Sequence, residues 1–346
     1  MTMNKYAPAY LTTVLATAAL GCLLVFAVNA LVDPLWYFGG NKAGTVNYAF
    51  NERLSKMNRF LATQSRYDCL IFGDSRVTLL PEDKIEGYRC FNFAFSAGKA
   101  AEAVAYARYI QARGVRPRLV VMGVPATAFR ARIGGTNIPD FIKTNDAPTS
   151  PFLAYLSIDV LSMSKQTLFG SSPLDRIYDR AFLCHVAPGA PEYDPAKPIR
   201  DLMAGKFTGT QRVKLYDEMR SIFPDAELVG YVPPISAWAI KAYADAGWLN
   251  DYVEAIHLAA GKFDRFLDYG IPSDMTIDTA NSYDGTHYSE AANATIARSL
   301  LSGGASGALD VKALSYGEMR EVYRERLVRY RHKLAAGLKN RTQSDR

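Results

Sequence analysis

The chain has few of the residues that cross-link small proteins or bind metals. Its 346 residues include four cysteines and four histidines, with no Cys-x-x-Cys pair and no histidine cluster. Four cysteines are too few for a disulfide scaffold, and no zinc site is indicated. Internal repeats and low-complexity segments are absent, and 49% of the residues are hydrophobic. We therefore expect a large folded core, and we expect no cofactor.

The chain also lacks a basic character outside its C-terminal end. The net charge is +6, and residues 312–346 hold ten Lys or Arg against four Asp or Glu, which is again +6 and leaves the first 311 residues neutral. We therefore expect no nucleic-acid partner. In the tail, 304–346, Met319, Tyr323 and Leu327 begin one apolar helical stripe that continues to Leu334. This stripe predicts a solvated helix packed on the body, and contact with anionic lipid or an acidic polymer is the alternative.

Charge is missing altogether from Ala9 to Val32, a stretch longer than the roughly 20 apolar residues that cross a bilayer. It follows a short flank, 1–8, and predicts an uncleaved single-pass anchor in contact with membrane lipid. A signal peptide is the alternative, because Val28-Asn29-Ala30 resembles a cleavage site, but its apolar core would be shorter. Lys5 and Lys42 lie on opposite sides of the stretch, so the excess of positive charge that usually marks the cytoplasmic side hardly indicates its orientation.

After the anchor, residues 33–64 predict a connector and a helix. Trp36 and Tyr37 fall where an interfacial aromatic belt would lie, and Asn51 is a candidate N-cap for a helix that runs to Thr63.

The next part of the chain alternates between buried strands and helices. Strands are predicted over 69–72, 89–95 and 119–124, with an alanine-rich helix over 99–112. This order is typical of a parallel α/β sheet. Cys69 and Cys90 open two neighbouring strands: they form a disulfide in an oxidising compartment, or they are buried free thiols, which is the simpler interpretation.

The pattern blurs over 132–205, which we interpret as an irregular insertion, and then returns. Helices are predicted over 210–222, 250–268 and 290–301, and strands over 227–232 and 274–277.

One serine stands where ligands bind in such sheets, past the carboxyl end of the first strand. It is Ser75, in Gly73-Asp74-Ser75. Among the histidines, His287 has a carboxylate at a suggestive spacing, Asp284, across a glycine. One turn would aim Asp284 at the imidazole of His287 and leave its other nitrogen for Ser75.

Together with Ser96-Ala97-Gly98 after the second strand, these blocks resemble the SGNH (GDSL-type) serine hydrolase family over roughly residues 68–301. The resemblance implies an SGNH-like α/β domain over 65–303, a parallel sheet flanked by helices. It implies that Ser75 is the nucleophile, His287 the general base and Asp284 its orienting carboxylate. The NH groups of Ser75 and Gly98 would then stabilise the oxyanion.

The third block departs from the family. Where the family has Gly-x-Asn, this chain has Gly123-Val124-Pro125, and proline offers no donor. Either another group such as Arg76 substitutes, or two donors suffice, or the site is inactive.

Similar departures occur in the membrane-linked branch that O-acetylates exported polysaccharides, such as the alginate acetylation proteins, and in proteins resembling the D-alanyl transfer protein. That likeness implies a body outside the cytoplasm, anchored in the inner membrane and facing the periplasm. It also implies acetyl transfer to, or removal from, a glycan through acyl-Ser75, with a polytopic membrane acyltransferase as partner. The alternatives are an inactive glycan-binding or scaffold protein and a lipid acylhydrolase, which should show an apolar groove beside Ser75.

Structural roles compete with these functional ones. Ser75 would merely cap a turn, His287 would be a turn residue, and Asp74 would hold the loop rather than do chemistry. We interpret His185 and His257 as structural. Trp238 and Trp248 are expected in the core, with stacking on sugars as the alternative.

Overall fold

The structure of the chain, a computed structural model, describes residues 7–131, 133–197, 206–302 and 307–339. The chain divides into two compact units. The N-terminal unit combines residues 1–62 with 146–187, and the sheet unit combines 63–145 with 188–346. These boundaries differ from those predicted from the sequence, which placed 33–64 in a connector and 132–205 in an insertion of the α/β domain.

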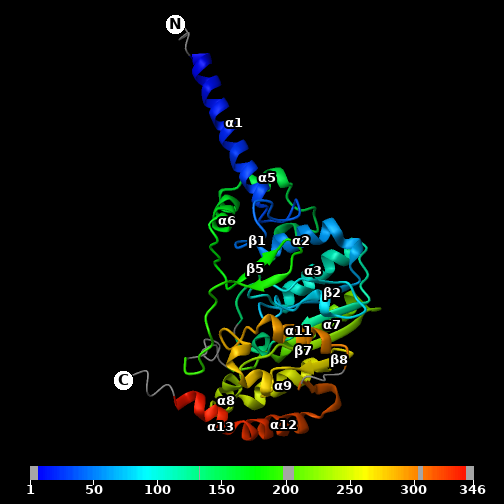
Figure 1. Ribbon diagram of the computed structural model, residues 1–346. Coiled ribbons are helices and arrows are strands. Elements are labelled where there is room, and N and C mark those ends of the chain that lie inside the picture. The colour runs from blue at the N-terminus through cyan, green and yellow to red at the C-terminus, as the bar shows by residue number, and fades with distance from the viewer. Residues whose placement is uncertain (1–6, 132, 198–205, 303–306, 340–346) are drawn as a thin grey trace. The chain divides into compact units, whose positions relative to one another are not determined.

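The N-terminal unit pairs two segments that are far apart in sequence. Its antiparallel sheet has the order β1-β5-β6, and its helices are α1, α2, α5 and α6 (Figure 1). Their bounds are α1 Ala7–Val32, β1 Val46–Asn47, α2 Glu52–Thr63, α5 Pro151–Tyr155, α6 Ile158–Leu168, β5 Arg176–Asp179 and β6 Cys184–Val186. Leu35, Tyr155 and Val160 form its buried cluster, so the second segment completes the core of the first. No periodic pattern in either segment alone reveals that pairing.

Within this unit, one helix is long and apolar enough to cross a membrane: Ala9–Val32, with a mean hydropathy of 2.3 and none of its most apolar window buried. Asn51 caps α2 as predicted, because its side-chain oxygen accepts from the Leu54 NH at 3.2 Å. Trp36 does not lie in an interfacial belt, since it is 1% exposed and its ring packs edge-on against Phe182.

The sheet unit carries a six-stranded sheet in the order β3-β2-β4-β7-β8-β9. The first five strands in this order are parallel, and β9 pairs antiparallel with β8. The strands are β2 Cys69–Phe72, β3 Cys90–Asn92, β4 Leu119–Gly123, β7 Glu227–Val232, β8 Arg265–Asp268 and β9 Leu309–Asp310. The predicted mixed α/β fold with a mostly parallel sheet is confirmed. The order reverses between β2 and β4, so a ligand crevice is expected at their carboxyl ends.

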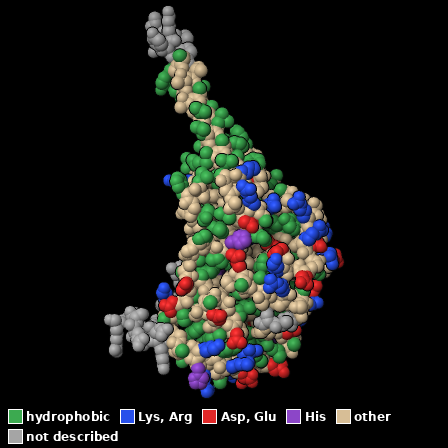
Figure 2. Space-filling view, in the orientation of Figure 1, with side chains coloured by type: hydrophobic (Ala, Val, Ile, Leu, Met, Phe, Trp, Pro, Cys, Tyr) green, Lys and Arg blue, Asp and Glu red, His purple; other side chains and the backbone are tan. Residues whose placement is uncertain are grey.

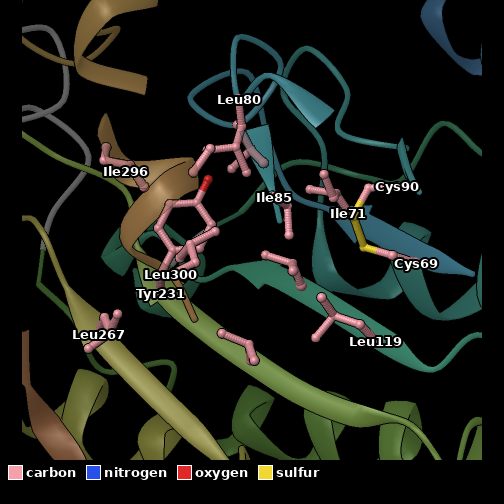
Figure 3. Packing of buried hydrophobic residues seen from close by; sticks show 14 of the residues in the cluster. Cys69, Ile71, Leu80, Ile85, Cys90, Leu119, Tyr231, Leu267, Ile296 and Leu300 are labelled. Carbon is pink, nitrogen blue, oxygen red and sulfur yellow. A yellow bond between two sulfur atoms is a disulfide. The ribbon is translucent and has the colours of Figure 1, made fainter. Parts of the chain in front are cut away.

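Helices of the sheet unit lie on both faces of its sheet (Figure 1). Their bounds are α3 Ala100–Ala112, α4 Asp140–Lys143, α7 Lys214–Ile222, α8 Ala237–Asp245, α9 Leu249–Ala260, α10 Asp274–Ile277, α11 Glu290–Ser299, α12 Tyr316–Arg329 and α13 Arg331–Lys339. Strand residues such as Ile71 and Leu119 belong to the same buried cluster as Ile296 and Leu300 of the α11 segment (Figure 3).

Cys69 and Cys90 form a disulfide between β2 and β3 (Figure 3). The simpler interpretation, two free thiols, was therefore wrong. The two residues are direct partners in the parallel register, with Cα atoms 4.2 Å apart, so the strand pairing itself brings the two side chains together.

Two predicted elements near the end of the sheet were also wrong. Residues 261–268 do not continue the helix, because α9 ends before Gly261 and β8 follows. Residues 274–277 form the helical turn α10 rather than a strand, and the paired side chains of Ser273 and Thr276 cap its first turn.

The tail packs on the sheet unit as the stripe predicted. Met319 and Tyr323 of α12 are 0% exposed, and Leu334 of α13 is 1% exposed. The Tyr323 hydroxyl donates to Asp268 at 2.5 Å, at the end of β8. Burial raises the pKa of Asp268 to about 6, although this bond and backbone NH groups oppose the rise.

Candidate active site

Ser75 lies at the carboxyl end of β2, in a tight turn. The Val77 NH donates to the Asp74 carbonyl at 3.0 Å, and the Thr78 hydroxyl donates to the Ser75 carbonyl at 2.8 Å. Gly73 has to be a glycine, because a Cβ there would lie 2.4 Å from a methyl group of Val77. The turn therefore holds the Ser75 hydroxyl at the edge of the sheet, half-buried.

The structure brings Ser75, His287 and Asp284 together. The Ser75 Oγ lies 2.7 Å from His287 Nε2, and His287 Nδ1 lies 2.7 Å from Asp284 Oδ2. Both distances are within hydrogen-bond reach, so the predicted proximity of these groups is confirmed. With Nδ1 donating to the carboxylate, Nε2 is the acceptor for the serine proton.

The turn that carries Asp284 and His287 is fixed by its own backbone. The other oxygen of Asp284, Oδ1, accepts from the Thr286 NH at 2.9 Å and the His287 NH at 2.7 Å. Gly285 adopts a φ of +83°, and a Cβ there would lie 2.6 Å from the ring of Tyr193. The glycine between the two residues is therefore required by both conformation and space.

Electrostatics favour the ionised form of Asp284. Burial works to raise its pKa, but the hydrogen bond and charge of His287, with the NH groups of Thr286 and His287, outweigh it and lower the pKa to about 2. At neutral pH a carboxylate therefore faces the imidazole, a placement that would stabilise an imidazolium if His287 took a proton.

Two further residues support the imidazole, and the sequence argument missed both. The ring of Tyr283 stacks on His287 with 5.4 Å between ring centroids and 7° between planes. The Thr286 hydroxyl donates to Asp284 Oδ1 at 3.1 Å. Thr286 lies between Asp284 and His287 and Tyr283 directly precedes them, but tyrosine and threonine are common in turns, so their identity carried no signal.

The predicted oxyanion donors differ in availability. The Ser75 NH makes no hydrogen bond to any residue that the structure describes. The Gly98 NH instead donates to the Phe95 carbonyl at 2.9 Å. A Cβ on Gly98 would lie 2.6 Å from the Gly73 carbonyl, so Gly98 allows the two loops to approach. Gly98 therefore allows close packing against the serine loop, while its NH is already hydrogen-bonded to the Phe95 carbonyl.

Arg76 ties the serine loop to the third block. Its guanidinium contacts Asp74 Oδ2 at 3.2 Å and the Thr127 hydroxyl at 2.7 Å, and its side chain is 10% exposed. Asp74 in turn accepts from the Arg76 NH at 3.0 Å. Asp74 thus holds the loop, as expected, and Arg76 braces it against the segment that follows Pro125.

A cavity of about 500 Å³ opens beside these loops, at the reversal point of the sheet. Gly73 and Gly98 are among its lining residues, and most of the others have small or apolar side chains, among them Ala97, Ala101, Ala128, Met122, Ile133 and Leu215. The volume is within the range of ligand pockets, about 300–1,000 Å³. The cavity is therefore a candidate site for an apolar part of a substrate.

The other residues singled out from the sequence lie elsewhere. His257 on α9 is within 3.2 Å of the Leu314 carbonyl, and His185 pairs with Asp179 at 3.3 Å in the N-terminal unit. The indole of Trp238, 7% exposed, donates to the Leu334 carbonyl at 3.1 Å, and so packs in the core as expected. Among the described residues no group of three His, Cys, Asp or Glu is placed to hold a metal.

Comparison with protein-family models finds no match for this sequence, and comparison with curated proteins finds no significant match either.

Proposed function

We propose that the chain is a membrane-anchored, SGNH-like serine acyltransferase or esterase that works through an acyl-Ser75 intermediate. The observation that carries this proposal is the continuous chain of hydrogen bonds from Ser75 Oγ through His287 to Asp284. A serine that only capped a turn would have no need of a histidine and a carboxylate in this order.

The geometry supports a two-step reaction. Ser75 Oγ attacks the ester carbonyl while His287 Nε2 takes its proton, and the Ser75 NH stabilises the oxyanion. Collapse expels the alcohol, protonated by His287, and leaves the acyl-serine. An incoming hydroxyl then gives its proton to His287 and attacks the acyl carbonyl; the bond to Ser75 breaks, and His287 returns the proton to the Ser75 oxygen. A glycan hydroxyl results in transfer, and water results in hydrolysis. For the Gly98 NH to join the oxyanion hole, it has to share or leave its bond to Phe95.

Two features support an uncleaved anchor and a body outside the cytoplasm. Cleavage after Ala30 would remove Asn29, which is 0% exposed and whose amide donates to the Tyr155 carbonyl at 2.8 Å. The disulfide of the sheet unit is typical of an oxidising compartment. We therefore propose a single-pass protein of the inner membrane that faces the periplasm and modifies an exported or cell-envelope polysaccharide.

The acyl donor and acceptor rest on the family resemblance alone. In the acetylating branch, an acyl group reaches the outside through a polytopic membrane acyltransferase, which is accordingly the proposed partner. The glycan is the proposed acceptor or substrate.

One observation favours a second candidate, an acylhydrolase for longer-chain esters. The cavity beside Gly73 and Gly98 is far larger than an acetyl group needs, and its wall is mostly apolar. An acyl chain placed there would leave water while its carbonyl stays near the serine loop.

The test is covalent labelling of the purified full-length protein with a fluorophosphonate, alongside turnover of p-nitrophenyl acetate. We expect labelling and turnover by the unchanged protein and loss of both in Ser75→Ala. Ser221→Ala is the control, because Ser221 is exposed on α7 and bonds only to a backbone carbonyl of its own helix. Failure of the unchanged protein to react would overturn the enzymatic proposal in favour of a glycan-binding or scaffold protein.

A further inference from the structure

The last turns of α1 are built into the N-terminal unit by specific contacts. The ring of Phe26 lies 5.5 Å from that of Phe152 on α5 and 6.3 Å from that of Tyr155. Asn29 donates to the carbonyls of Tyr155 and Ser157, and its oxygen accepts from Ser164 on α6 at 2.8 Å. The junction of α5 and α6 is therefore held at the level of residues 26–29 of α1.

That level lies inside the apolar span. The span covers 24 residues, Ala9–Val32, which is about 36 Å of helix, against a hydrocarbon core of about 30 Å. If the span is centred, about 3 Å projects at each end, and Phe26, six residues before Val32, lies about 6 Å inside the core. Side chains that contact Phe26 then reach hydrocarbon depth as well.

The side chains presented there are apolar and uncovered within the described residues. Phe152 and Leu153 of α5 are 58% and 64% exposed, and Ile158 at the start of α6 is 79% exposed. Figure 2 shows hydrophobic side chains along α1 that continue at its base, where Figure 1 labels α5. Together these three residues form what we name the α5–α6 wedge.

Several polar groups in and beside the wedge have partners, which lowers the cost of a position at the edge of the hydrocarbon. The Ser150 hydroxyl accepts from the Leu153 NH, and Pro151, at the first position of α5, has no NH to satisfy. The Ser157 hydroxyl likewise accepts from the Asp159 NH at 3.2 Å. The amide of Asn29, the polar side chain at this depth of α1, is fully engaged. Asp159, exposed beside Ile158, limits the depth to the boundary with the headgroups.

We propose that the α5–α6 wedge inserts into the bilayer leaflet that contains the C-terminal end of α1. The N-terminal unit would then contact the membrane through both α1 and the wedge. The occupant of this apolar surface is lipid, because the surface is continuous with the spanning helix. The inference rests on α1 spanning a membrane and is independent of the chemistry at Ser75. The wedge also takes the place of the interfacial aromatic belt that the sequence predicted at Trp36 and Tyr37. Trp36 is buried, and Phe152 and Leu153 supply the apolar contact with the membrane instead.

The test is spin labelling of the full-length protein in phospholipid vesicles, with collisions measured against oxygen and against a water-soluble nickel chelate. Labels are attached one at a time at native Cys22, and at Leu153→Cys, Ile158→Cys or Phe169→Cys in a Cys22→Ala background. Cys184→Ala is present throughout, and the Cys69–Cys90 disulfide takes no label. Cys22, exposed within the span, calibrates the hydrocarbon. Phe169 is the matched control, because it is 79% exposed but follows the opposite end of α6.

We expect labels at 153 and 158 to share the high oxygen and low nickel collision rates of Cys22, while the label at 169 shows high nickel rates. High nickel rates at 153 and 158 would place the wedge in water, and low rates with both reagents would place it against protein. Either result overturns the proposal, provided that the label at Cys22 shows the high oxygen and low nickel rates of a lipid environment. If the label at Cys22 shows high nickel rates, α1 does not span the bilayer, and the proposal for the wedge is overturned with it. The fluorophosphonate test of Ser75 does not depend on this result.

Discussion

Asp284→Asn is the substitution that most sharply separates a catalytic triad from a group of hydrogen-bonded turn residues. The change keeps the size of the side chain and the oxygen that accepts from the Thr286 and His287 NH groups. It replaces Oδ2, which lies 2.7 Å from His287 Nδ1, with an NH₂ group or forces the amide to turn. An amide donor there requires Nδ1 to accept, which moves the imidazole proton to Nε2.

The magnitude follows from that tautomer. With a proton on Nε2, the imidazole no longer accepts from Ser75 Oγ, and the imidazolium of the transition state loses its carboxylate. In serine proteases the equivalent change lowers kcat about 10⁴-fold with the geometry intact, which corresponds to about 5 kcal/mol of transition-state stabilisation. Binding of the ester should change little, so the loss should fall on kcat rather than KM.

The assay is steady-state turnover of p-nitrophenyl esters by the full-length protein in detergent, with thermal unfolding as the check on folding. Asp278→Asn is the matched control: Asp278 is an exposed aspartate in the same stretch that caps the Ala280 NH, a role asparagine also performs. We expect the control to retain its turnover. A folded Asp284→Asn protein with kcat within about threefold of the unchanged protein would contradict the orienting role of Asp284, which predicts a loss of about 10⁴.

Three further predictions concern the sheet unit. Ala128→Phe should fill part of the cavity and lower the ratio of octanoate to acetate ester turnover, measured as kcat/KM for each; an unchanged ratio would place the acyl chain elsewhere. Because burial raises the pKa of Asp268 from 3.8 to about 6, the carboxyl favours the folded state below about pH 4, and about 3 kcal/mol is lost as pH rises through 6. Urea unfolding across this range should show that loss, and Asp268→Asn should remove it; parallel pH curves would contradict the assignment. Reduction of the Cys69–Cys90 disulfide, which closes a loop of sequence separation 21, should lower the free energy of unfolding by about 3 kcal/mol, and Cys69→Ser should be insensitive to reductant.

The sequence predicted the sheet unit well where a strand is buried on both faces. The run at 69–72 is continuous and apolar, the run at 227–232 carries no charge after Glu227, and both strands form over those residues. Prediction failed where the local pattern was ambiguous. Phe266 and Leu267 follow α9 closely enough to look like its continuation, and only Gly261 and the pairing with β7 make them a strand.

The pairing of the two segments of the N-terminal unit could not be predicted from local sequence patterns, for a different reason. Its core depends on residues 35 and 155 meeting, and no local pattern in either segment indicates which distant segment it packs against. The triad, by contrast, followed from short motifs and from the rule that carboxyl ends of parallel strands share an edge. What the motifs missed was backbone detail, above all the engagement of the Gly98 NH with Phe95.

The most direct test of the central claim is to trap the acyl-enzyme. The full-length protein would be mixed with an excess of p-nitrophenyl acetate, quenched in acid within the first turnover and digested for mass spectrometry. We expect an acetyl group on the Ser75 hydroxyl, at higher occupancy in the unchanged protein than in His287→Ala. Acetylation confined to lysines, or equal occupancy of Ser75 in both proteins, would contradict a nucleophile activated by His287.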